Sequence, residues 1–69
     1  MKSISGREFI RVLERHGWVL LRVNGSHHIF GKSDSIVRLS IPVHGNAAMK
    51  VGLLRHAMKL AGLQEADLD

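Results

Sequence analysis

The chain has 69 residues, contains no cysteine and carries a formal charge of +4. This length indicates one small domain, and the lack of cysteine excludes disulfides and thiolate metal sites and fits a reducing cytoplasm. No apolar run approaches the roughly 20 residues that a membrane-spanning helix needs, so we expect no membrane association.

The charge is unevenly distributed along the chain. Residues 1–63 carry ten Lys and Arg against three Asp and Glu, a formal +7, and the other three acidic residues lie in the last few positions. A basic body favours a polyanionic partner, either nucleic acid or an acidic protein surface. The alternative is a soluble domain with basic faces and no such partner. We expect a single domain over 1–69, with a core of about 4–63 and an acidic tail at 64–69.

A capping box opens the first predicted helix. Ser5 is followed three residues later by Glu8, so the serine oxygen can accept from the Glu8 amide while the carboxylate reaches back. Gly17 is suited to the left-handed conformation that ends helices. Between them, apolar residues recur at helical spacing, namely Phe9, Val12 and Leu13. The pattern predicts a helix from about residue 6 to residue 16.

From Trp18 to Ile41 the pattern is typical of strands. The segments "WVLLRV", "SHHIF" and "IVRLSI" are separated by "NG", a strong hairpin signal, and by the turn-like "GKSDS". Pro42 ends the third segment because it has no amide to donate to a neighbouring strand. The sequence predicts a three-stranded antiparallel meander.

A second helix follows the loop "PVHGNAA", starting at about Met49 or Lys50 and running to Ala61. Its apolar stripe has helical spacing and consists of Leu54, Ala57, Met58 and Ala61. Gly62 ends it. The expected fold is therefore α+β in the order α-β-β-β-α, with both helices on one face of the sheet and the other face open.

Two adjacent histidines stand in the second predicted strand, where neighbouring side chains point to opposite faces. Burying Phe30 stabilises the fold by about 1.5–3 kcal/mol, which favours Phe30 and His28 against the helices and His27 on the open face. Ile29 would share that open face, so the preference is modest. An inward His28 needs a hydrogen-bond partner for its ring nitrogen.

An outward His27 would lie near the third strand, whose outward residues include Arg38 and Ser40. An imidazole beside a guanidinium suits phosphate chemistry, and the alternative is an ordinary surface histidine. A metal site is not expected, because the remaining histidines lie on three other elements and no carboxylate cluster accompanies them. We expect no cofactor.

At this point the residues resemble a known family. "GWVLLRVNGSHHIFG", "VRLSIPVHG" and "MKVGLLRHAMKLAGL", in that order, resemble the HicA family of small toxins, which belong to HicA–HicB toxin–antitoxin pairs. The similarity runs from "FIRVLERHGW" in the first helix to Leu63. Gly-Ser-His, Pro-x-His-Gly and Gly-x-Leu-Arg together make a fairly specific signature. The chain departs from the family at Val51, where a proline is usual, and in loop 46–48, which lacks a lysine.

The resemblance implies a double-stranded-RNA-binding-like fold and a ribonuclease that cuts messenger RNA without metal. It implies that His27 is the catalytic residue, preceded by Gly25 and Ser26. As a hypothesis, His27 takes the proton from a ribose 2′-OH. Arg38 in the first place, and Arg22 in the second, stabilise the charged phosphorane.

Other basic residues are expected to hold the RNA backbone, namely Lys50, Arg55 and Lys59, although a solvated helix face is an equally good explanation. His44 either contacts RNA or hydrogen-bonds its own loop.

The resemblance also implies a HicB-type antitoxin as partner. Val19, Leu21 and Val23 alternate on the face left open, and outward apolar residues beside a catalytic histidine predict a covered surface. We expect the partner to cover Val19, Leu21 and His27, while a homodimer through the same face is the competing explanation. Two other functions remain open: an RNA-binding module that does not cut, and a pure protein-interaction domain.

Overall fold

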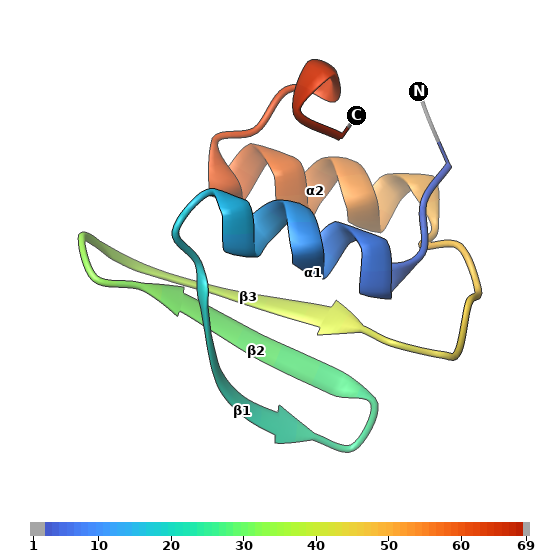
Figure 1. The fold of residues 1–69 in the computed structure, drawn as a ribbon, viewed down its shortest axis with the longest axis horizontal. Coiled ribbons are helices and arrows are strands. Elements are labelled where there is room, and N and C mark those ends of the chain that lie inside the picture. The colour runs from blue at the N-terminus through green and yellow to red at the C-terminus, as the bar shows by residue number, and fades with distance from the viewer. Residues whose placement is uncertain (1–2, 69) are drawn as a thin grey trace.

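The computed structural model describes residues 3–68 as two helices, three strands and a short C-terminal turn of helix. The elements are α1 (Gly6–Arg15), β1 (Val19–Asn24), β2 (His27–Lys32), β3 (Ser35–Pro42), α2 (Val51–Ala61) and the 3₁₀ helix η1 (Glu65–Leu68). The strands form one antiparallel sheet in the order β1-β2-β3, and both helices cover the same side of it (Figure 1). The predicted α+β class and α-β-β-β-α order are confirmed. Met1, Lys2 and Asp69, which the predicted domain and its tail include, lie outside the described residues.

The capping box and the terminal glycine of α1 form as predicted. The Glu8 amide donates to Oγ of Ser5 at 3.1 Å, and the Ser5 amide donates to the Glu8 carboxylate at 3.0 Å. At the other end Gly17 has a φ of 90°, and the Trp18 amide donates to the Leu13 carbonyl at 3.1 Å. The Leu13 carbonyl also accepts from the His16 amide at 2.9 Å, so both bonds meet at the last turn of α1.

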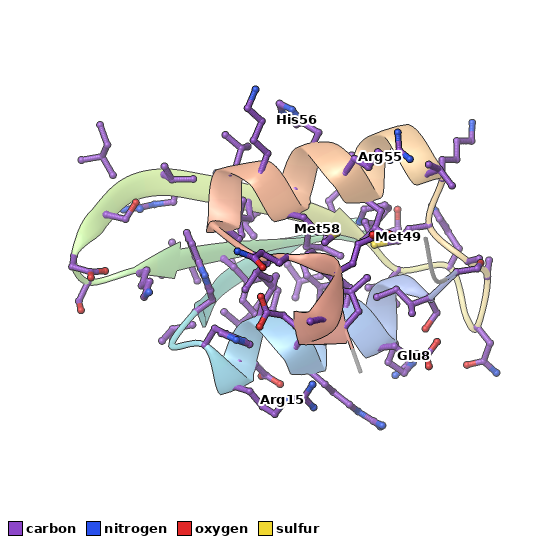
Figure 2. All side chains as sticks on the ribbon, turned by 90° about the horizontal axis from the view of Figure 1, so that it is seen from above. Glu8, Arg15, Met49, Arg55, His56 and Met58 are labelled. Atoms are coloured by element: carbon purple, nitrogen blue, oxygen red, sulfur yellow. The ribbon has the colours of Figure 1, made fainter. Side chains whose placement is uncertain are left out.

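Helix α2 begins at Val51, one or two residues later than predicted. Lys50 is its N-cap, with extended φ and ψ of −63° and 138°. The preceding chain cannot be helical, because the Met49 amide donates to the Ile4 carbonyl at 2.8 Å and Ala48 pairs with Ser5 as an isolated bridge. Seen from above, α1 and α2 lie side by side, with Met49 and Met58 between them (Figure 2).

The core lies between the helices and the sheet, mainly over β2 and β3. Its fully buried side chains come from both layers and are Phe9, Leu13, Phe30, Leu39, Ile41 and Leu54. Strand β1 is different, because all six of its residues are exposed and it lies at the edge farthest from the helices (Figure 1). The sheet therefore extends beyond its helical cover.

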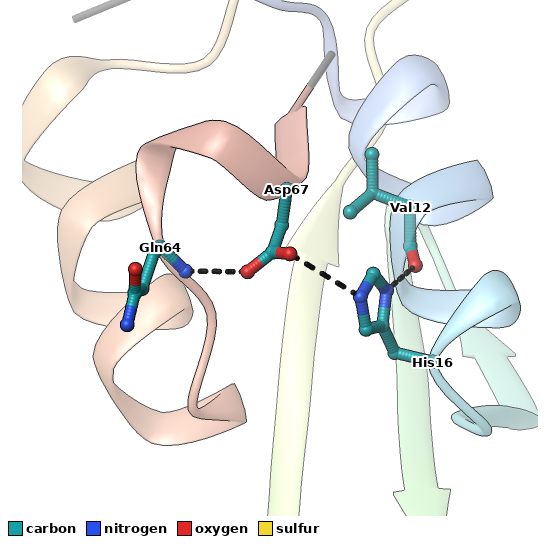
Figure 3. Close-up of polar contacts among 4 residues, drawn as sticks. All are labelled: Val12, His16, Gln64 and Asp67. Carbon is teal, nitrogen blue, oxygen red and sulfur yellow. Dashed lines mark hydrogen bonds and ion pairs between the residues drawn. The ribbon is translucent and has the colours of Figure 1, made fainter.

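The C-terminal segment is packed rather than extended, which the sequence analysis did not anticipate. Leu68 is 5% exposed and belongs to the core. The Asp67 carboxylate accepts from the Gln64 amide at 2.8 Å and lies 3.6 Å from Nε2 of His16, whose Nδ1 donates to the Val12 carbonyl at 2.8 Å (Figure 3). These contacts join η1 to the end of α1.

Candidate functional site

The two adjacent histidines lie on opposite faces of β2, as predicted. His28 pairs with Ile41, and Phe30, which is 1% exposed, pairs with Leu39. Because Ile41 and Leu39 are buried against the helices and cross-strand partners share a face, His28 faces the helices. His27 is exposed on the open face of the sheet.

The hydrogen-bond partner expected for His28 is not found. Its Nδ1 is buried, and none of the described residues donates to it or accepts from it. Because the rest of the side chain is only half-buried, the ring lies at the boundary of the core, where the helices no longer cover the sheet.

The β1–β2 turn lies one residue later than the "NG" dipeptide suggested. Its two central residues are Gly25 and Ser26, and Gly25 has a φ of 63° while Ser26 does not have a positive φ. A positive φ at the first central residue is the pattern of a type II′ turn, which favours glycine there. As a result, Asn24 lies directly opposite His27.

Ser40 orients the exposed imidazole. Its Oγ lies 3.2 Å from Nδ1 of His27. Ser40 itself pairs with Ile29, so the contact is a diagonal one across β2 and β3. The hydrogen bond restricts rotation of the ring and involves one of its two nitrogens, while Nε2 is not bonded to any of the residues that the structure describes.

His27 borders the cavity that the structure forms where β3 ends and α2 begins. The cavity has a volume of about 430 Å³ and is lined by His27, Pro42, His44, Ala47, Ala48, Met49, Lys50 and Leu53. It therefore brings together three of the predicted site residues, His27, His44 and Lys50. Its apolar wall was missed, because no pattern in the sequence relates the 47–49 loop and Leu53 to the second strand.

Arg38 does not lie beside His27, contrary to the expectation from the sequence. It lies next to Gly31, with Nη1 3.2 Å from the position that a Cβ on Gly31 would occupy, and its guanidinium donates to the Val37 carbonyl at 3.1 Å. Gly31 is four positions after His27 along β2, which corresponds to about 13 Å of strand between His27 and the residue beside Arg38. The regular register of β2 and β3, in which His27 pairs with Pro42 and Phe30 with Leu39, brings Arg38 opposite Gly31 rather than His27.

Arg22 is nearer to the exposed histidine. It pairs with Ile29, while the neighbouring Asn24 pairs with His27, so Arg22 is a diagonal neighbour of His27 on the open face. Arg22, the second choice from the sequence, is therefore closer to His27 than Arg38 is.

A bulge in β1 changes the face that its last residues occupy. The register shifts between Leu20 and Arg22, and Val23 then pairs with His28. The prediction that Val23 shares the open face is therefore wrong. Val19 and Leu21 remain 60% and 52% exposed, and Leu21 covers Gly31, where its Cδ1 lies 2.7 Å from the position of an added Cβ.

The remaining basic candidates lie on α2 outside the cavity. Arg55 and Lys59 are exposed, and Arg55 and His56 project from the side of α2 that faces away from α1 (Figure 2). Only Lys50, the N-cap, borders the cavity. Of these three candidates, Lys50 therefore borders the cavity, whereas Arg55 and Lys59 lie along α2 away from it.

Neither a metal cluster nor a membrane span is found in the part of the chain that the structure describes. Residues 3–68 contain no group of three or more His, Asp or Glu side chains placed to hold a metal ion. Neither helix has the length and apolar composition to cross a bilayer.

Comparison with protein families identifies a family for this chain. The family model described as "HicA toxin of bacterial toxin-antitoxin" matches residues 6–63, which is most of the chain. None of the curated proteins matches this sequence.

Proposed function

The chain belongs to the HicA toxin family of bacterial toxin–antitoxin systems, and we propose on that premise that it is a metal-independent endoribonuclease that cuts messenger RNA in the cytoplasm. The observation that carries the proposal is the position of His27. This imidazole is exposed on the open face, hydrogen-bonded to Ser40 at 3.2 Å, and borders a cavity that also contains Lys50. A histidine in such a position can act on a bound phosphodiester.

In the proposed reaction His27 removes the proton from a ribose 2′-OH. The oxygen attacks the adjacent phosphorus, the bond to the 5′ oxygen breaks, and the products end in a 2′,3′-cyclic phosphate and a 5′-OH. The Lys50 ammonium borders the same cavity and offsets the charge that develops on the phosphorane. Arg22, a diagonal neighbour of His27, adds positive potential from β1.

The outer side of α2 would hold the RNA without choosing its sequence. Arg55 and Lys59 are exposed there, and contacts from such side chains to phosphates supply affinity that falls steeply with salt. The excess of basic residues over positions 1–63 supports this assignment.

The antitoxin, which we expect to be of the HicB type, would bind across β1 and the open face. Val19 and Leu21 are exposed apolar residues on an edge strand whose outer backbone groups pair with no other described strand. Edge strands of this kind accept a strand from another protein. A partner bound there would cover His27 and stop cleavage, and a second copy of this chain is the competing occupant.

The test compares two adjacent histidines on opposite faces. His27→Ala should leave a folded protein whose RNA cleavage falls by roughly 10²–10⁴-fold, the usual contribution of a general base. His28→Ala should lower the melting temperature and leave cleavage per folded molecule close to that of wild type. His16→Ala, which removes an imidazole at the end of α1 away from the cavity and from the outer side of α2, is the control. Wild-type cleavage by the His27 variant would refute the enzymatic proposal.

A second candidate function is an RNA-binding module that does not cut. The basic surface favours it, since the charge alone accounts for binding. It would be supported if neither wild type nor the His27 variant cleaved RNA while both bound it with a steep dependence on salt.

A further inference from the structure

The cavity beside His27 contains a second imidazole. His27 and His44 both line it, one from β2 and one from the loop after β3. The cleavage proposed above requires two proton transfers, because the attacking oxygen loses a proton and the leaving oxygen gains one. In an in-line displacement these oxygens lie on opposite sides of the phosphorus. A base and an acid on two different elements suit that geometry.

Two contacts keep the chain after β3 close to His27. Pro42, the last residue of β3, is the direct partner of His27, and the Val43 amide donates to the Ser26 carbonyl at 2.8 Å. His44 follows Val43 and lines the same cavity as His27. The cavity volume of about 430 Å³ leaves room for a phosphodiester.

The loop that carries His44 is held at both ends. The Ala47 amide donates to the His44 carbonyl at 3.0 Å, and Gly45 between them has a φ of 57°, which favours glycine. Beyond the turn, the Met49 amide donates to the Ile4 carbonyl at 2.8 Å. His44 thus lies on a short segment tied to β2 on one side and to the start of α1 on the other.

The other described histidines are engaged or located elsewhere. His16 contacts Val12 and Asp67 at the end of α1. His28 faces the helices, and His56 lies on the outer side of α2. Within residues 3–68, His44 is therefore the one histidine that shares the cavity with His27.

We propose that His44 is the general acid of the reaction, donating a proton to the 5′ leaving oxygen while His27 accepts the proton of the 2′-OH. The inference rests on the proposed function and assigns its second catalytic residue. The bond from the 2′ oxygen to phosphorus forms as the bond to the 5′ oxygen breaks. The first proton stays on His27, the second leaves His44, and exchange with solvent restores both rings before the next turnover.

A change of leaving group distinguishes this role from any other. We would measure cleavage of an oligoribonucleotide at saturating concentration, once with the natural 5′ oxygen and once with a bridging sulfur at that atom, a leaving group that needs no proton. His44→Ala should slow cleavage of the oxygen substrate by roughly 10²–10⁴-fold, and should leave the sulfur substrate nearly unaffected. His27→Ala should slow both substrates.

Two further variants complete the experiment. His44→Gln keeps polarity and approximate size but cannot donate a proton as an acid, so it should behave like His44→Ala. The melting temperature of each variant is recorded, and a value close to that of wild type excludes a folding defect. His16→Ala removes an imidazole at the end of α1, away from the cavity and from the side of α2 assigned to RNA, and should cleave both substrates like wild type per folded molecule. If the His44 variants slowed both substrates equally, or slowed neither, the assignment of His44 as the acid would be overturned. The proposed function would still stand in that case, because the wild-type protein cleaves RNA. Failure of wild type to cleave either substrate would refute both.

Discussion

Removal of the Leu68 side chain is the sharpest test of how this small domain is stabilised. Leu68 is 5% exposed and packs into the core from the last described turn of the chain. Replacing a buried leucine by alanine costs about 2–5 kcal/mol, because transfer energy is lost and a cavity remains. Since η1 is a single short turn of 3₁₀ helix that can relax toward the core, we expect about 2–3 kcal/mol.

That loss is large for a protein of this length. At roughly 0.05–0.15 kcal/mol per residue, the whole chain is stable by only about 3–10 kcal/mol. A loss of 1 kcal/mol lowers the melting temperature of such a domain by about 4–8 °C. Leu68→Ala should therefore lower it by roughly 10–20 °C.

The measurement is thermal and denaturant unfolding followed by circular dichroism. Leu60→Ala is the matched control, because it makes the same change on α2 at a side chain that is 42% exposed, and we expect it to cost no more than about 1 kcal/mol. If the two variants unfolded at the same temperature, η1 would not be part of the stabilising core.

Two glycines and two arginines give further expectations. Gly6→Ala should destabilise by about 1–3 kcal/mol, because a Cβ there would overlap the Pro42 carbonyl oxygen. Gly52→Ala should stabilise the fold by about 0.5–1 kcal/mol, since a Cβ there meets open space. Chemical denaturation measures the free energy of unfolding of both glycine variants. If both substitutions changed it in the same direction, the packing argument would be contradicted. Arg22→Ala should slow RNA cleavage by roughly tenfold, equivalent to about 1.4 kcal/mol, and by more than Arg38→Ala. The reverse order in single-turnover rates would show that proximity to His27 does not decide their roles.

Much of the fold and part of the site could be predicted, because the signals that define them are local. The capping box at Ser5 satisfies amides within one turn, and Gly17 ends α1 by adopting a conformation that other residues resist. Successive side chains of a strand point to opposite faces, and this alternation is a property of the strand itself. Once Phe30 was assigned to the core face, His27 was assigned to the open face.

Other features depend on which strands and loops meet, and no local pattern encodes that. The register of β2 and β3 brings Arg38 opposite Gly31 rather than His27, and the bulge in β1 brings Arg22 closer to His27 and turns Val23 to the other face. Such shifts arise from packing between strands, where one extra residue reverses every later side chain.

The sequence by itself determined the order of the elements, the face of the sheet on which His27 lies and the family to which the chain belongs. Only the tertiary structure decided that His44 and Lys50 share a cavity with His27, and that Leu68 completes the core. The physical reason is that hydrogen bonds within a turn or along one strand depend on neighbouring residues, whereas a cavity or a core contact depends on the three-dimensional meeting of segments far apart in the chain.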